Sequence, residues 1–159
     1  MDLKNYIRSI PDYPKKGILF RDITTLIKNA EAFRYTNDKI IEISKKIEFD
    51  KVAAIESRGF VFAAPLSHQL KKHFILLRKK NKLPADTHSV DFELEYGKAT
   101  VEVHKYSINK DEKILIVDDE PDIIEILKYN INNEGYYVKS ANNGKKAVEK
   151  AKKLAKDAA

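Results

Sequence analysis

Short apolar runs and alternating segments along the chain predict the strands of one sheet. Residues 52–55, 74–77 and 114–117 are uniformly apolar, which is typical of strands that are buried on both faces. Residues 91–96 and 99–106 alternate in polarity on either side of a turn and predict a β-hairpin. The chain is therefore expected to combine buried strands of the parallel type with an antiparallel pair.

Apolar residues at helical spacing predict helices that alternate with these strands. The expected helices cover residues 2–9, about 30–47, 60–71 with a bend or an interruption at Pro65, the stretch from Pro121 to a cap at Gly135, and 145–155. A strand over 136–141 is expected between the last two. Residues 78–91 predict a long polar loop that contains His88. The alternation predicts an α/β fold, a mostly parallel open sheet flanked by helices, with a β-hairpin.

The composition fits one globular domain. The chain has 159 residues, of which 43% are hydrophobic and 34% charged, so it can bury a single core. No apolar run approaches the roughly 20 residues that cross a bilayer, and the first residues lack the apolar core of a secretory signal. Because there is no cysteine, disulfides and thiolate metal sites are excluded, and we expect a cytoplasmic protein with no membrane partner.

The net charge of +6 raises the question of nucleic-acid binding. Much of the excess lies at 71–72, 78–82 and 145–156, where lysines on helices usually mark a solvated face. Since no aromatic residues interleave with these clusters, we expect no nucleic-acid partner. The cluster at 78–82 would serve a phosphorylated small molecule equally well. The four histidines have no metal-ligand spacing and are expected to be structural or to face solvent.

The segment of residues 11–24 contains an apolar-aromatic element followed by Arg21 and Asp22. Such an element can hold a flat base by stacking while backbone groups contact the edge of the base. A buried Phe beside a structural Arg-Asp pair is the alternative interpretation.

Two further segments have residue types that suit phosphates. Ser57 and Arg58 directly follow the strand 52–55, and Gly59 allows backbone N–H groups and a guanidinium to approach a phosphate closely. Residues 78–84 begin with a group of cations, which suits the phosphate of a small molecule.

These segments together resemble the adenine phosphoribosyltransferases, almost continuously over residues 2–119. The resemblance implies a glycosyltransferase of purine salvage that converts adenine and phosphoribosyl pyrophosphate to AMP and pyrophosphate, with Mg²⁺ and as a homodimer. It implies that Leu19, Phe20 and Arg21 bind the base and that Ser57 and Arg58 contact the pyrophosphate. It implies that Arg78, Lys79 and Lys82 are cations of a catalytic loop and that Glu95 is the acid/base group near the purine N7. Asp118 and Asp119 are implied to contact the ribose or a metal ion. Asn81 stands where the family commonly has Gly, and Asn tolerates positive φ.

Residues 120–124 depart from that family where its Thr- and Gly-rich loop cradles the 5′-phosphate. Small residues there expose N–H groups at a helix N-terminus, and hydroxyls donate further hydrogen bonds. In this chain Pro121 removes a donor, while Glu120 and Asp122 add negative charge. Each repulsion a few ångströms from a phosphate costs on the order of 1–4 kcal/mol. We therefore expect donor binding to be badly weakened or lost and the enzyme to be impaired.

The residues from 113 onward resemble the start of a bacterial response-regulator receiver domain. The matching segments are 113–122, 134–138 and 141–147. In that family the acidic pair, here Asp118 and Asp119, binds the Mg²⁺ that supports aspartyl phosphorylation. We do not expect a phosphoryl switch, because the sequence ends before the strand that would carry the phosphoacceptor Asp.

Two hypotheses for function follow. The first is that the chain is an adenine phosphoribosyltransferase with impaired activity. In this hypothesis residues 1–119 form a phosphoribosyltransferase-like part, and a receiver-like βαβα fragment, residues 113–159, completes its sheet. The two parts share the strand 114–119. The second is a non-enzymatic chimeric hybrid or a truncated signalling fragment with at most Mg²⁺ binding. In a third interpretation of the acidic pair, Asp118 and Asp119 are strand-end carboxylates without a ligand.

Overall fold

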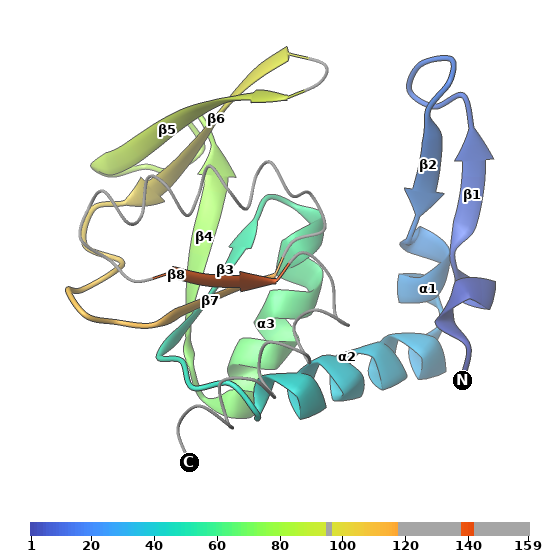
Figure 1. The fold of residues 1–159 in the computed structure, drawn as a ribbon, viewed down its shortest axis with the longest axis horizontal. Helices are drawn as coiled ribbons and strands as arrows, with labels where there is room; N and C mark the ends of the chain where they lie inside the picture. Colours follow the sequence, from blue (N-terminus) through green and yellow to red (C-terminus); the bar gives the residue numbers. More distant parts are fainter. Residues whose placement is uncertain (95–96, 118–137, 142–159) are drawn as a thin grey trace. The chain divides into compact units, whose positions relative to one another are not determined.

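The computed structural model describes residues 1–94, 97–117 and 138–141 of the chain, and Figure 1 shows their course. Two compact units are present, Met1–Glu42 and Ile43–Ala159. Each unit has its own sheet and is considered separately.

The first unit consists of a short hairpin followed by helices. Its elements are η1 (Leu3–Tyr6), β1 (Arg8–Pro11), β2 (Leu19–Asp22), α1 (Thr24–Lys28) and α2 (Ala30–Ser44), the last of which continues across the boundary between the units. The strands β1 and β2 pair antiparallel, with Arg8 opposite Asp22 and Pro11 opposite Leu19. The helix predicted over about 30–47 is confirmed by α2.

The predicted helix over residues 2–9 is wrong beyond its first turn. Leu3–Tyr6 form a 3₁₀ helix, and the Asp2 carboxylate at its start accepts a hydrogen bond from the Lys4 N–H at 3.0 Å. The residues of β1 are extended because β2 supplies backbone hydrogen-bond partners along their whole length. A helix of eight residues is marginal by itself, so this pairing outweighs the helical periodicity.

The second unit is a six-stranded sheet with one described helix against it. Its elements are β3 (Lys51–Ile55), α3 (Arg58–Leu70), β4 (His73–Lys79), β5 (Thr87–Leu94), β6 (Gly97–His104), β7 (Ile114–Val117) and β8 (Val138–Ala141). The order across the sheet is β5-β6-β4-β3-β7-β8. Strands β4, β3, β7 and β8 are parallel, whereas β6 pairs antiparallel with β4 and with β5. This mixed sheet confirms the predicted α/β class.

The loop predicted over 78–91 is shorter than expected, and this prediction is corrected. Strand β4 continues to Lys79 and β5 begins at Thr87, so His88 lies in a strand. The reason is that β6 pairs with both strands, placing Val101 opposite Lys79 and Val103 opposite His88. The helices predicted after Pro121 and over 145–155 lie outside the described residues, whereas the strand predicted over 136–141 corresponds to β8.

The two faces of β3 have different neighbours. One face belongs to the buried core cluster of Ala53, Ile75, Leu77, Val101, Ile114 and Ile116. The opposite face carries Ala54, because successive side chains of a strand alternate, and α3 packs there. A Cβ atom on Gly59 of α3 would lie only 3.2 Å from the Cβ of Ala54. Glycine therefore permits the close approach that fixes the start of α3 above the end of β3.

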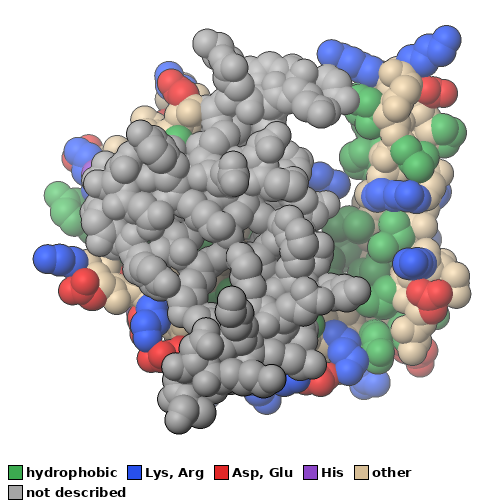
Figure 2. Space-filling model, viewed as in Figure 1, with side chains coloured by type: hydrophobic (Ala, Val, Ile, Leu, Met, Phe, Trp, Pro, Cys, Tyr) green, Lys and Arg blue, Asp and Glu red, His purple; other side chains and the backbone are tan. Residues whose placement is uncertain are grey.

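The visible surface mixes charged and apolar side chains. In Figure 2, lysine and arginine side chains lie among hydrophobic and acidic ones on the part that is not grey. Within the described ranges of the chain, no helix has both the length and the apolar character needed to cross a membrane. The expected absence of a nucleic-acid partner stays a prediction.

Candidate active site

The hairpin of the first unit carries Leu19, Phe20 and Arg21 on β2. The half-buried ring of Phe20 meets the Tyr13 ring edge to face, with centroids 5.1 Å apart and an interplanar angle of 68°. Leu19 and Arg21 are exposed, and a guanidinium nitrogen of Arg21 donates to Ser9 Oγ on β1. Because neighbouring strand residues point to opposite faces, Arg21 shares a face with Leu19, and Phe20 occupies the other.

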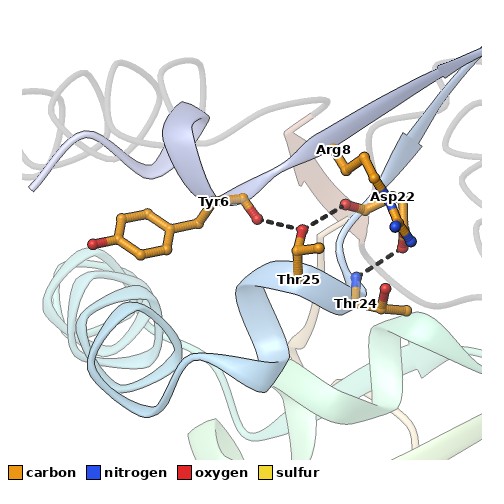
Figure 3. A network of polar contacts seen from close by, with 5 residues as sticks. All are labelled: Tyr6, Arg8, Asp22, Thr24 and Thr25. Carbon is orange, nitrogen blue, oxygen red and sulfur yellow. Dashed lines mark hydrogen bonds and ion pairs between the residues drawn. The ribbon is translucent and has the colours of Figure 1, made fainter.

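A polar network anchors this hairpin to helix α1 (Figure 3). The Asp22 carboxylate accepts hydrogen bonds from Arg8 Nε at 3.0 Å and from the Thr24 N–H at 2.9 Å. Thr25 Oγ1 donates to the Tyr6 carbonyl at 2.7 Å. The hydrogen bonds from Thr24, and then the one from Arg8, lower the pKa of Asp22 to about 2. Asp22 is therefore an anionic anchor of the hairpin. The alternative interpretation predicted a structural Arg-Asp pair here, but the arginine that binds Asp22 is Arg8.

Ser57 and Arg58 lie where β3 ends and α3 begins, and both side chains are exposed. Ser57 is the N-cap residue of α3, and the peptide bond between Glu56 and Ser57 is cis. Within the described part of the chain, the Ser57 hydroxyl makes no capping hydrogen bond. The N–H groups that open a helix point outward along its axis and attract anions. The segment thus offers donors at the carboxyl end of a parallel strand, where ligands of α/β sheets commonly bind.

The predicted cations Arg78, Lys79 and Lys82 lie at the end of β4 and in the turn that follows it. Strand β4 is the parallel neighbour of β3, so the carboxyl ends of the two strands meet. The Arg78 guanidinium donates to both carboxylate oxygens of Glu56, from Nε to Oε2 at 3.3 Å and from Nη2 to Oε1 at 3.1 Å. Its Nη1 donates to the Lys82 carbonyl at 2.8 Å. The structure therefore joins the predicted phosphate segment to the predicted cationic turn through Glu56.

Two carboxylates at this turn were not predicted as site residues. Glu56 also accepts a hydrogen bond from the Lys79 N–H at 3.1 Å. Donation from the Arg78 side chain, and then from Lys79, lowers the pKa of Glu56 although burial opposes the shift. Buried Glu102 on β6 accepts a hydrogen bond at 2.9 Å from the N–H of Asn81, whose φ is +62°. The position of Glu56 directly before the phosphate segment is the one signal in the sequence that could have identified it.

The predicted site residues Glu95, Asp118 and Asp119 lie outside the described residues. The strand that precedes the acidic pair, β7, is described and is the parallel neighbour of β3. Among the residues that the structure describes, no group of three or more His, Asp or Glu side chains could hold a metal ion. The described carboxylates near the strand ends, Glu56 and Glu102, already accept hydrogen bonds. The Mg²⁺ site that the resemblance implies at Asp118 and Asp119 stays a prediction.

The sequence and the fold have close relatives among known proteins. Residues 23–121 match the phosphoribosyl transferase domain family. The adenine phosphoribosyltransferase of Pelagibacter ubique is 72% identical over 119 residues, which make up 75% of this chain and 68% of that protein. This chain belongs to the adenine phosphoribosyltransferase family.

Solved structures of the family share the fold. The crystal structure of adenine phosphoribosyltransferase from Thermoanaerobacter pseudethanolicus has a TM-score of 0.79 and 41% identity, covering 86% of this chain and 81% of that one. The Saccharomyces cerevisiae adenine phosphoribosyltransferase, in complex with D-2,5-dideoxy-2,5-imino-altritol 1,6-bisphosphate and adenine, has a TM-score of 0.75 and 27% identity, covering 86% of this chain and 82% of that one. The predicted resemblance to this family is thus confirmed. These comparisons give no evidence for the receiver-like portion, most of which lies outside the described residues.

Proposed function

We propose that the chain transfers the phosphoribosyl group of phosphoribosyl pyrophosphate to adenine, forming AMP and pyrophosphate in purine salvage. The observation that carries this proposal is the 72% identity to the P. ubique adenine phosphoribosyltransferase. The geometry of the strand ends supports it, because Ser57 and Arg58 adjoin the cationic turn through Glu56.

Leu19, Phe20 and Arg21 are the residues that we assign to adenine. The half-buried ring of Phe20 offers a flat apolar surface for stacking. Arg21 donates to Ser9 from the other face of β2, so its assignment to adenine is supported by the family resemblance alone. The yeast relative was crystallised with adenine, which supports a base site in a protein of this fold.

We assign Ser57 and Arg58 to the pyrophosphate group of the donor. As N9 of adenine bonds to the ribose C1 and the bond from C1 to the pyrophosphate oxygen breaks, negative charge accumulates on the leaving group. The exposed side chains of Lys79 and Lys82 supply positive charge at the neighbouring strand end, and cations already in place stabilise such charge without rearrangement. Glu95 is assigned to proton transfer near the purine N7.

Asp118 and Asp119 are assigned to the ribose hydroxyls and to Mg²⁺. They directly follow β7, so their place in the chain is the carboxyl end of a central parallel strand. Mg²⁺ prefers carboxylate and phosphate oxygens, and when bound it would neutralise part of the charge of the donor's diphosphate.

The segment Glu120, Pro121 and Asp122 is proposed to weaken donor binding, because its charges repel the 5′-phosphate and Pro121 lacks an N–H. The receiver-like continuation of the sheet is part of the same proposal. The parallel pairing of β8 with β7 is compatible with it, since both families would continue the sheet in this way.

Formation of AMP from adenine and phosphoribosyl pyrophosphate with Mg²⁺, followed by chromatography, tests the transferase. The P. ubique relative is the matched control. We expect AMP from both proteins, with a KM for the donor at least about tenfold higher for this chain. If no AMP forms at any donor concentration, the transferase is refuted and the non-enzymatic hybrid is favoured. Equal KM values would refute the weakened donor site.

A second experiment isolates the segment after the acidic pair. Replacing residues 120–124 with a Thr- and Gly-rich loop should tighten binding of phosphoribosyl pyrophosphate measured by calorimetry. An unchanged Kd would show that these residues are not the defect. The homodimer and the cytoplasmic location stay predictions, and sedimentation velocity tests the first of them.

A further inference from the structure

We infer that Glu56 is a positioning residue that couples the pyrophosphate segment to the cationic turn by holding Arg78. In this assignment Arg78 is a structural residue whose guanidinium is held in place, and it is not a mobile cation. Lys79 and Lys82 supply the positive charge near the leaving pyrophosphate. The inference rests on the proposed transferase function, which it deepens at the same site.

The contact between Glu56 and Arg78 has the geometry of a clamp. Both carboxylate oxygens are engaged, by Arg78 Nε at 3.3 Å and Nη2 at 3.1 Å. Such bidentate contacts fix the plane of the guanidinium as well as its position. The Glu56 side chain is 17% exposed and that of Arg78 30% exposed, so solvent competes only partly with the pair. The backbone of Glu56 is itself fixed, because its N–H donates to the Leu77 carbonyl of β4 at 2.9 Å.

The same guanidinium closes the cationic turn. Arg78 Nη1 donates to the Lys82 carbonyl at 2.8 Å, and the Lys82 N–H donates to the Lys79 carbonyl at 3.2 Å. Of the five N–H groups of the Arg78 side chain, three are thus bonded within the protein. On its other side the turn is held by the bond from the Asn81 N–H to Glu102. Because these hydrogen bonds fix Arg78, they also fix the backbone positions from which the side chains of Lys79 and Lys82 extend.

Charge alone predicts the opposite effect from positioning. Glu56 is a carboxylate beside a site for a pyrophosphate anion, so replacing it with neutral Gln removes a repulsion. A purely electrostatic role therefore predicts tighter pyrophosphate binding after Glu56→Gln. If Glu56 instead orients Arg78, the same substitution loosens the turn and weakens binding although the net charge becomes more favourable. The sign of the change distinguishes the two roles.

The experiment measures binding of inorganic pyrophosphate to the full chain by calorimetry, together with steady-state kinetics. For Glu56→Gln we expect pyrophosphate binding weaker by about tenfold, the effect of losing a charge-assisted hydrogen bond. We expect the KM for the donor to rise by a similar factor while the KM for adenine stays unchanged. Glu48→Gln is the matched control, since Glu48 precedes β3 at its opposite end, is 85% exposed and forms an ion pair with Lys113.

An Arg78→Lys background tests whether Glu56 acts through Arg78. Lysine cannot make the two-pronged contact, so adding Glu56→Gln there should change pyrophosphate binding by less than about twofold. If Glu56→Gln fails to fold, Glu56→Asp replaces it, because the shorter side chain keeps the charge but cannot reach both guanidinium donors. Unchanged or tighter binding in the folded variant would overturn the inference. Absence of AMP formation by the unmodified chain would refute the transferase alone, since the pyrophosphate measurement does not require turnover.

Discussion

The connection between β6 and β7 is held to the central strand by one partly buried ion pair, and its removal should be measurable. Lys51, the first residue of β3, places Nζ 2.7 Å from Glu112 Oε2 and 2.8 Å from the Ser107 carbonyl. The Glu112 carboxylate also accepts hydrogen bonds from Asn109, from its N–H at 2.6 Å and from Nδ2 at 2.9 Å. The substitution Glu112→Gln removes the charge and leaves the shape of the side chain almost unchanged.

The size of the effect follows from the pKa of Glu112. Burial raises this pKa, but the hydrogen bonds from Lys51 and Asn109 outweigh it and lower the pKa from 4.5 to about 2. This lowering of the Glu112 pKa on folding corresponds to about 3 kcal/mol of folding free energy. Because the Glu112 side chain is 21% exposed, solvent screening reduces the expected value to about 2 kcal/mol at neutral pH.

The pH dependence has a definite sign. Since the pKa of Glu112 is lower in the folded state, its contribution is complete above about pH 4.5 and is lost as the pH falls toward 2. Urea unfolding followed by circular dichroism at pH 7, 5 and 3 should therefore show a difference between the original chain and Glu112→Gln that shrinks at the lowest pH. The comparison of two chains at each pH cancels the titration of all other groups.

Glu48→Gln is the control for this measurement. Glu48 is 85% exposed, and its ion pair with Lys113 at 2.7 Å should contribute about 0–1 kcal/mol. If Glu112→Gln destabilises the chain no more than Glu48→Gln does, or if its effect is the same at every pH, then the proposed role of the ion pair is wrong.

Two further substitutions test the packing and the backbone around the site. Gly59→Val should lower the free energy of unfolding by about 1–3 kcal/mol, because its Cβ would meet the Cβ of buried Ala54 at 3.2 Å; an unchanged thermal midpoint would mean that α3 can move away from β3. Asn81→Val should lower the free energy of unfolding by about 1–2 kcal/mol because φ is +62° at that residue, whereas Asn81→Gly should not lower it. Equal urea midpoints for the two variants would contradict this expectation.

The class of the protein and most of its sheet could be predicted from sequence patterns. The uniformly apolar runs at 52–55, 74–77 and 114–117 became β3, β4 and β7, which are parallel neighbours in the order β4-β3-β7. Strands buried on both faces tolerate such runs. The expected burial on both faces is wrong for β4 at Leu76, which is 39% exposed. The phosphate and cation segments were recognisable because their residue types follow strand ends directly. Such local signals depend on neighbours in the chain and need no tertiary information.

The pairing of segments that lie far apart in the chain could not be predicted, because it depends on how the chain folds. Residues 8–11 are a strand because β2 hydrogen-bonds to them, and β4 and β5 are longer than their patterns because β6 pairs with both. The hydrogen-bond partners of Glu56 and Glu102 could not be predicted, since each carboxylate accepts from a donor in another segment of the chain. Sequence patterns report burial and local backbone preference, whereas the partner of a charged side chain is set by which strand ends the fold brings together.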